Sequence, residues 1–134
     1  MKRKFKYNLL SNAFNKKDIN EGIKVLKSKK VTISKITEKF EKYFAKKMGT
    51  KYALMTNSGS SANLLAVSAL SNPLNKYKIP SNSEIIIPAI CWSTSLWPII
   101  QNNYKPVFVD VETDTFNIDI NKIEKKITRK TKAI

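Results

Sequence analysis

Residues 52–70, YALMTNSGSSANLLAVSAL, decide the fold class. Residues 52–56 form a short run typical of a strand, and a polar turn follows at 57–61. From 62 to 70 the chain is apolar on nearly all sides apart from Asn63 and Ser68, which is typical of a buried helix. A strand, a turn and a helix in this order predict the first half of a βαβ unit.

The same alternation continues downstream. Residues 71–83 carry Asn, Pro and Ser and predict a loop. Residues 84–87, EIII, predict a strand that is covered on both faces, because three consecutive isoleucines leave no polar face. A loop and then a helix around 96–101 follow, with Pro98 in its first turn, and residues 106–111 predict a third strand.

The last residues extend this pattern. Asp119 is expected to cap a final helix on which Ile120, Ile123 and Ile127 align, and residues 131–134 predict the start of another strand. The alternation predicts an α/β fold with a mainly parallel sheet flanked by helices. Because a sheet ending here would keep an exposed edge, we expect the chain to be an incomplete, N-terminal part of a longer protein.

Two amphipathic helices are predicted upstream. Residues 1–16 form a basic, aperiodic lead-in, and the domain proper is expected over 17–134. Asp18 is expected to cap a helix that runs to about Lys29, and Ser34 a second helix that ends at Gly49. Ile19, Ile23 and Leu26 share one face of the first helix. On the second helix we expect four side chains to face inward: Ile36, Phe40, Tyr43 and Phe44.

The composition excludes several kinds of chemistry. The 134 residues contain no His and a single Cys, Cys91. Within this chain there is therefore no Ser-His-Asp triad, no Cys-His pair, no His-ligated zinc and no disulfide, and we predict no metal site. Cys91 is expected to be a small core residue. The chain shows neither a signal peptide nor an apolar run of about 20 residues, so we expect a cytoplasmic protein without a membrane partner.

The charge is unevenly distributed. The formal net charge is +15, and most of it lies in residues 1–51, which hold 16 basic and 4 acidic side chains. A basic segment of this kind is compatible with an anionic partner. However, only Arg3 and Arg129 are arginines among the 25 basic residues, and Arg is the usual reader of phosphates and bases. The bias therefore favours lysines on solvated helix faces over a nucleic-acid interface.

The polar turn at 57–61 is a candidate phosphate site. Gly59 is expected to allow a tight turn, which places Ser60 and Ser61 in the first turn of the following helix. Free N–H groups, two hydroxyls and the positive end of the helix dipole would then converge. A serine that caps an ordinary helix explains the same residues equally well. With one Gly and no Lys after it, the motif is neither a Walker A loop nor GxGxxG.

A second candidate follows the strand at 84–87. Trp92 lies just beyond its carboxyl end, where ligands bind in open α/β sheets. The indole offers a flat face to an aromatic ring, although a Trp packed in the core under a helix is the ordinary alternative.

These residues carry a family resemblance. The runs TNSGSSANLLAVSAL (56–70) and EIIIPAICWSTSLWPIIQNNYKPVFVDVETDTFNID (84–119) resemble the N-terminal half of the large domain of the DegT/DnrJ/StrS sugar aminotransferases. The resemblance implies an aspartate-aminotransferase-like fold (fold type I) and pyridoxal 5'-phosphate as cofactor. It also implies a nucleotide-linked keto sugar and an amino donor as substrates, and a homodimer as the intact enzyme.

The resemblance also implies roles for individual residues. Ser60 and Ser61 match the positions that hold the cofactor phosphate, with the turn at Gly59, and Trp92 matches the aromatic residue that stacks on the pyridine ring. Asp110 is similar to a family residue and is expected to be a structural carboxylate. The family's Schiff-base lysine and its acidic partner of the pyridinium lie downstream of the matched region, so we nominate no catalytic residue here.

The motifs GSSAN (59–63) and WSTSLWPIIQ (92–101) are similar to those of a lipopolysaccharide-type subgroup of the family. This subgroup includes sugar 3-dehydrases, in which a His replaces the Schiff-base Lys. The sequence therefore predicts part of an enzyme for transamination or 3-dehydration of nucleotide sugars in surface polysaccharide or deoxysugar biosynthesis. Two alternatives stay open: a truncated product without activity, and a basic module that binds anions or nucleic acid.

Overall fold

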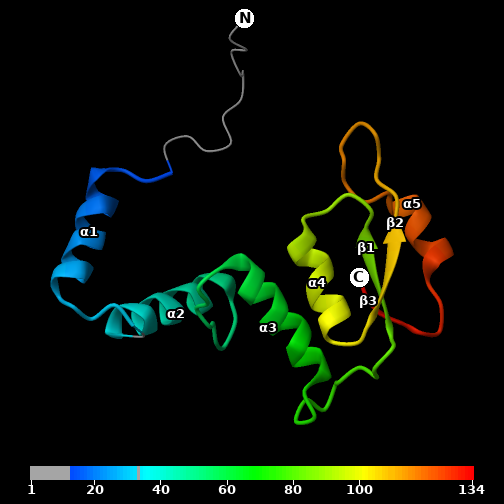
Figure 1. Cartoon of the computed structure of the whole chain (residues 1–134), viewed down its shortest axis with the longest axis horizontal. Coiled ribbons are helices and arrows are strands. Elements are labelled where there is room, and N and C mark those ends of the chain that lie inside the picture. Colours follow the sequence, from blue (N-terminus) through cyan, green and yellow to red (C-terminus); the bar gives the residue numbers. More distant parts are fainter. Residues whose placement is uncertain (1–12, 33) are drawn as a thin grey trace, which may run out of the picture. The chain divides into compact units, whose positions relative to one another are not determined.

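Three parallel strands form the sheet in the computed structural model, which describes residues 13–32 and 34–134. The strands are β1 (Glu84–Pro88), β2 (Lys105–Val109) and β3 (Thr131–Ala133), in the order β2-β1-β3 (Figure 1). In the pairing of β1 with β2, Ile86 lies opposite Val107. The parallel sheet and all three of these strands confirm the prediction from the sequence.

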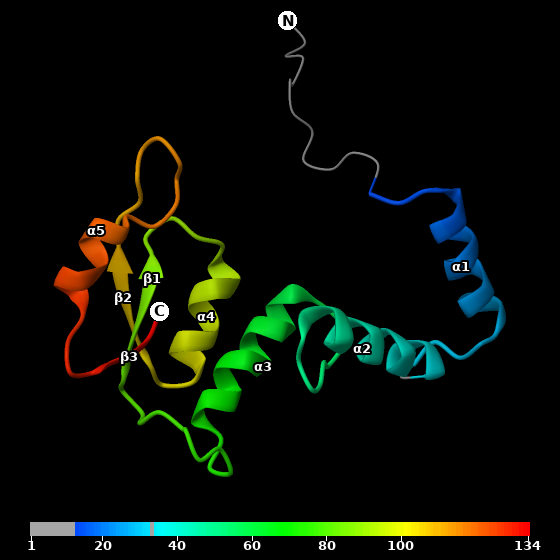
Figure 2. The same cartoon turned by 180° about the vertical axis from the view of Figure 1, so that it is seen from behind.

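The core is built around β1. Ile85, Ile86 and Ile87 are each at most 6% exposed, so both faces of this strand are covered, as predicted. Ile85 and Ile87 pack with Ile99 of α4 (Ser93–Gln101) and with Tyr104. Helices α4 and α5 (Ile120–Ile123) lie on opposite sides of the strands in both views (Figures 1 and 2). Burying apolar side chains on both faces of a central strand is the main contribution to stability here.

The connection from β2 to β3 contains a short helix. Asp119 is the N-cap of α5, since its side chain accepts a hydrogen bond from the Asn121 N–H at 3.0 Å. This confirms the predicted cap. Helix α5 has four residues, and a 3-10 turn, η1 (Glu124–Lys126), continues it.

Two helices lie upstream, α1 (Lys16–Lys27) and α2 (Lys35–Met48). The N-cap of α1 is Asn15, not Asp18 as predicted; Asp18 sits at the third position of the helix and completes a capping box with Asn15. Ser34 caps α2 as predicted. Gly49 ends α2 with φ 68°, a left-handed conformation that glycine adopts without steric cost.

The inward orientation predicted for the apolar side chains of the second helix is wrong. No residue of α1 is buried, Ala45 is the buried residue of α2, and the predicted inward-facing side chains are all more than 40% exposed. Phe40 and Phe44 stack on one another, with ring centroids 5.6 Å apart. The contacts divide the chain into one unit up to Met55 and another over Thr56–Ile134.

Three further predictions need correction. Residues 52–56 form no strand; the Met55 N–H instead donates to the Glu41 carboxylate at 2.8 Å. The predicted buried helix is α3 (Gly59–Ser71), which begins earlier than expected and has no buried residue. Helix α4 also begins earlier, at Ser93, so Pro98 lies in its second turn rather than its first. In the described part of the chain no helix is long and apolar enough to cross a membrane.

Candidate functional site

The first turn of α3 presents the predicted serines. Ser58 is the N-cap: its Oγ accepts a hydrogen bond from the Ser61 N–H at 3.1 Å and donates to the Ser61 Oγ at 3.2 Å. Ser60 and Ser61 are the second and third residues of the helix, as predicted. The ordinary N-cap explanation thus holds for Ser58, and it leaves the two following serines to be explained.

Several donors at this helix end stay available. Within the described residues, the N–H groups of Gly59 and Ser60 and the Ser60 hydroxyl have no acceptor. Gly59 is the first helical residue and has no positive φ, so the bend before α3 does not use the left-handed conformation that glycine permits. A Cβ on Gly59 would meet no atom within 4 Å, so the space around it is open. These donors and the helix dipole form a set that suits an anion.

Trp92 begins the neighbouring helix. It is the N-cap residue of α4, and its carbonyl accepts from the Ser95 N–H at 2.9 Å. Its side chain is not packed in the core, because the residue is 77% exposed. Cys91 is exposed as well, so its prediction as a core residue is wrong.

A hollow of about 240 Å³ is lined by residues of both α3 and α4. Ser60, Ser61 and Leu64 line it from α3, and four residues line it from α4: Thr94, Trp97, Pro98 and Gln101. The structure therefore brings the two serines together in one hollow. Trp92 is not among the lining residues, although it lies two residues before Thr94.

Trp97 was missed by the sequence reasoning. It is half-exposed and contributes to the wall of the hollow that the two serines line. Its signal in the sequence is the spacing of Thr94, Trp97, Pro98 and Gln101, which is that of one helix face. This signal becomes visible only once α4 is known to begin at Ser93.

A hydrogen bond joins α3 and α4 near their N-terminal ends. The side-chain amide of Asn63 donates to the Thr94 carbonyl at 3.4 Å. In a regular helix that carbonyl would accept from the N–H of residue 98, but Pro98 has none. Asn63 thus supplies the donor that the proline removes.

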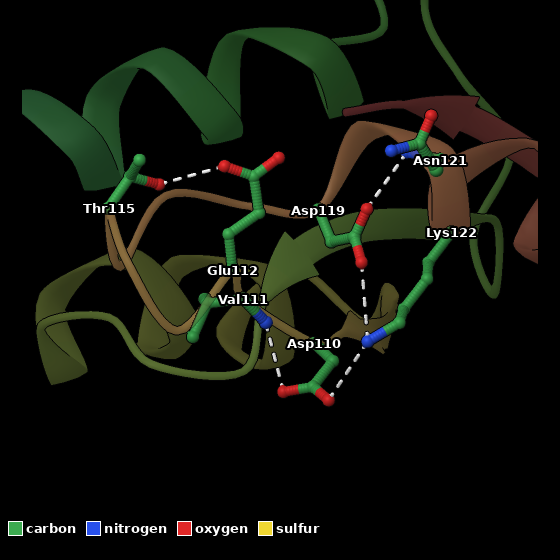
Figure 3. Close-up of polar contacts among 7 residues, drawn as sticks. All are labelled: Asp110, Val111, Glu112, Thr115, Asp119, Asn121 and Lys122. Carbon is green, nitrogen blue, oxygen red and sulfur yellow. Dashed lines mark hydrogen bonds and ion pairs between the residues drawn. The ribbon is translucent and has the colours of Figure 1, made fainter.

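A second polar cluster follows β2 (Figure 3). The Asp110 carboxylate accepts from the Val111 N–H at 2.9 Å, and Lys122 Nζ lies 3.3 Å from Asp110 Oδ2 and 3.2 Å from Asp119 Oδ2. The Val111 N–H bond and the Lys122 ammonium lower the pKa of Asp110 below its usual value. The two carboxylates raise the pKa of Lys122.

These contacts give Asp110 a structural setting. Its contact with Lys122 links the end of β2 to α5. An isolated antiparallel β-bridge between Val111 and Ile118 lies next to it. In the turn between them, the Thr115 hydroxyl donates to Glu112 at 3.0 Å (Figure 3). The geometry therefore supports the interpretation of Asp110 as a structural carboxylate.

Comparison with known proteins places this geometry in a family. Residues 12–134 match the DegT/DnrJ/EryC1/StrS aminotransferase family. The chain belongs to this family. The match covers both units of the chain and every element described above.

Individual members of the family agree with the match. The chain is 39% identical over 126 residues to a GDP-4-keto-6-deoxy-D-mannose 3-dehydratase of Yersinia pseudotuberculosis, covering 94% of this chain and 32% of that protein. It is 34% identical over 119 residues to a dTDP-3-amino-3,6-dideoxy-alpha-D-galactopyranose transaminase of Aneurinibacillus thermoaerophilus, covering 88% of this chain and 31% of that protein.

A solved member shows the same fold. The structure of the E. coli GDP-4-keto-6-deoxy-D-mannose-3-dehydratase with bound hydrated PLP superposes with a TM-score of 0.85 at 39% identity, covering 96% of this chain and 33% of that one. The α/β fold with a parallel sheet is therefore that of the PLP-dependent members of the DegT/DnrJ/EryC1/StrS family, as predicted. The chain spans about a third of the length of these relatives.

Proposed function

We propose that the chain holds the phosphate and the ring of pyridoxal 5'-phosphate in an enzyme that acts on nucleotide-linked keto sugars. Ser60, Ser61 and the N–H groups at Gly59 and Ser60 bind the phosphate, and Trp92 stacks on the pyridine ring. The observation that carries this proposal is the hollow in which the two serines of α3 lie together, beside the start of α4.

The available donors fit a phosphate. The N–H groups of Gly59 and Ser60 and the Ser60 hydroxyl lack acceptors in the described residues, and no Lys or Arg lines the hollow. A dianion would therefore be stabilised by hydrogen bonds and by the helix dipole rather than by a basic side chain. Open space at Gly59 lets such a group approach the backbone closely.

When bound, the cofactor supplies an electron sink for the bond changes in the substrate. The residues of this chain contribute binding and orientation: the hydroxyls and N–H groups fix the phosphate, and the exposed indole fixes the plane of the ring. We assign no catalytic residue here. No lysine of the described residues lines the hollow, and the sequence has no His.

For the reaction, 3-dehydration of a GDP-linked 4-keto-6-deoxy sugar is favoured over transamination. Two 3-dehydratases are 39% and 43% identical to this chain, against 34% for a transaminase. Mass spectrometry of the sugar product separates the two: loss of the 3-hydroxyl indicates dehydration, and exchange of the keto group for an amino group indicates transamination. Self-association into a homodimer is part of the same proposal, and sedimentation velocity tests it.

The cofactor site can be tested with 4'-deoxypyridoxine 5'-phosphate. This compound keeps the ring and phosphate of the cofactor but has no aldehyde, so it cannot react with surface lysines. We expect it to quench tryptophan emission saturably. Ser61→Ala should weaken binding about tenfold, because a hydrogen bond to a charged group is lost.

Two controls test separately the phosphate contact of Ser61 and the ring contact of Trp92. The same compound without its phosphate should bind weakly and be insensitive to Ser61→Ala. Trp92→Phe should remove most of the quenching, and Trp97→Phe should leave it. The reverse pattern would move the ring to Trp97 and refute the role of Trp92, and a probe that does not bind would refute the whole site.

A further inference from the structure

We propose that Asn63 is a positioning residue, which holds the two helix ends of the cofactor site together by replacing the hydrogen bond that Pro98 removes. The proposal rests on the function proposed above. It concerns how the site keeps its shape, because Asn63 itself does not line the hollow that holds the serines.

Pro98 leaves the Thr94 carbonyl without its usual hydrogen-bond donor. Pro98 lies inside α4, and it has no N–H to donate to the carbonyl of Thr94 four residues earlier. That carbonyl stands in the first turn of α4, where Thr94 also lines the hollow. A helix carbonyl without a donor is satisfied by solvent or by another group.

Asn63 of α3 supplies a donor to this carbonyl. Its side-chain amide donates a hydrogen bond to the Thr94 carbonyl at 3.4 Å, which links the second turn of α3 to the first turn of α4. Asn63 follows Ser60 and Ser61 by three and two residues, and Trp92 precedes Thr94 by two. The bond therefore ties the helix that carries the two serines to the helix that begins after Trp92.

Pro98 is also what makes the arrangement specific. With an alanine at 98, the N–H of that residue would bond to the Thr94 carbonyl within α4, so the carbonyl would keep a donor when Asn63 is replaced. The roles of the two side chains are thus coupled: the importance of Asn63 for the site depends on the proline. Coupling of this kind is measured by a double-mutant cycle.

The experiment compares four proteins: the unaltered chain, Asn63→Leu, Pro98→Ala and the double variant. Leucine keeps the branching and size of asparagine but has no donor. The readouts are the dissociation constant of 4'-deoxypyridoxine 5'-phosphate and the urea midpoint of unfolding without ligand.

With Pro98 present, we expect Asn63→Leu to weaken binding of the probe about fivefold, the effect of one ordinary hydrogen bond. With alanine at 98, the same substitution should change binding less than about twofold. Equal losses in both backgrounds, or no loss with Pro98 present, would overturn the proposal. Asn63→Ala is the second variant if leucine prevents folding.

The urea measurement distinguishes failure of this proposal from failure of the cofactor site. If the unaltered chain does not bind the probe, the proposed function fails, and the cycle in unfolding midpoints still decides whether Asn63 and Pro98 are coupled. If the probe binds and depends on Ser61 but the cycle shows no coupling, the cofactor site stands and the role of Asn63 is refuted.

Discussion

The two units of the chain differ in what holds their helices. In the unit up to Met55, α1 and α2 have side-chain caps, and a left-handed glycine ends α2. Nevertheless α1 has no buried residue, and in α2 the buried residue is Ala45. In the unit over Thr56–Ile134, three isoleucines of β1 lie under packed helices. The comparison teaches that local signals are enough to place a helix, whereas burial depends on partners that are distant in the sequence.

The largest expected effect tests the core of the second unit. Ile86→Ala removes a side chain that is 2% exposed and should lower the free energy of unfolding by about 3 kcal/mol. Ile23→Ala on α1, where the isoleucine is 42% exposed, should cost about 0.5 kcal/mol. Urea unfolding measures both. Similar losses would show that α1 is buried in solution; Ile86→Val, at about 1 kcal/mol, serves if the alanine variant does not fold.

The same distinction explains what the sequence could predict. Ser34, Gly49 and Asp119 were identified correctly because each acts on neighbours within a few residues. The three isoleucines of β1 predicted a doubly covered strand because a short β-branched run leaves no polar face for solvent. Asp18 was mistaken for a cap because Asn15 and Asp18 share one capping box, and either residue is typical of an N-cap.

Burial and packing depend on residues that are distant in the sequence, and these features were predicted less well. The burial expected for Phe40 or Ile36 requires a surface that covers it, and periodicity does not reveal one. In the candidate site, the positions of Ser60 and Ser61 followed from the helix that Ser58 starts. The sharing of a hollow with Trp97 did not follow, because it depends on how α3 packs against α4. The cofactor roles of these residues stay predictions.

A buried hydroxyl offers an expected gain in stability. Tyr104 is 4% exposed, and its hydroxyl has no hydrogen-bond partner among the described residues. Tyr104→Phe removes an unsatisfied polar group and should raise the free energy of unfolding by about 1 kcal/mol. Tyr43→Phe on α2, at an exposed tyrosine of the first unit, should leave it unchanged. A loss of stability in Tyr104→Phe would mean that the hydroxyl does have a partner.

A capping variant tests the local stability of α1 in the first unit. Asn15→Ala removes the acceptor for the N–H groups of Lys17 and Asp18, and it should destabilise α1 by about 1 kcal/mol. Because nothing in α1 is buried, the loss should appear as faster amide exchange within α1, with little change in β1. Asn15→Ser keeps a capping oxygen and is the control. Faster exchange in β1 as well would show that the two units unfold together.

The smallest effect concerns the ion pairs of Lys122 with Asp110, which is exposed, and with Asp119, which is partly buried. Because Lys122 itself is half-exposed, we expect these pairs to contribute little. The pKa of Asp110 is lowered in the folded chain, so its contribution is present above the unfolded pKa of about 3.9 and is lost as the pH falls through the folded pKa. The pKa of Lys122 is raised, so its contribution is present below about 10.4 and is lost at higher pH. Lys122→Gln should therefore lower the urea midpoint slightly at pH 7, and the difference from the unaltered chain should disappear near pH 2.

Lys24→Gln, which breaks the pair with Glu21 on α1, is the matched control: it should leave the midpoint of the second unit unchanged at every pH. A difference for Lys122→Gln that persists at pH 2 would show that the lysine acts through packing of its aliphatic stem rather than through its charge.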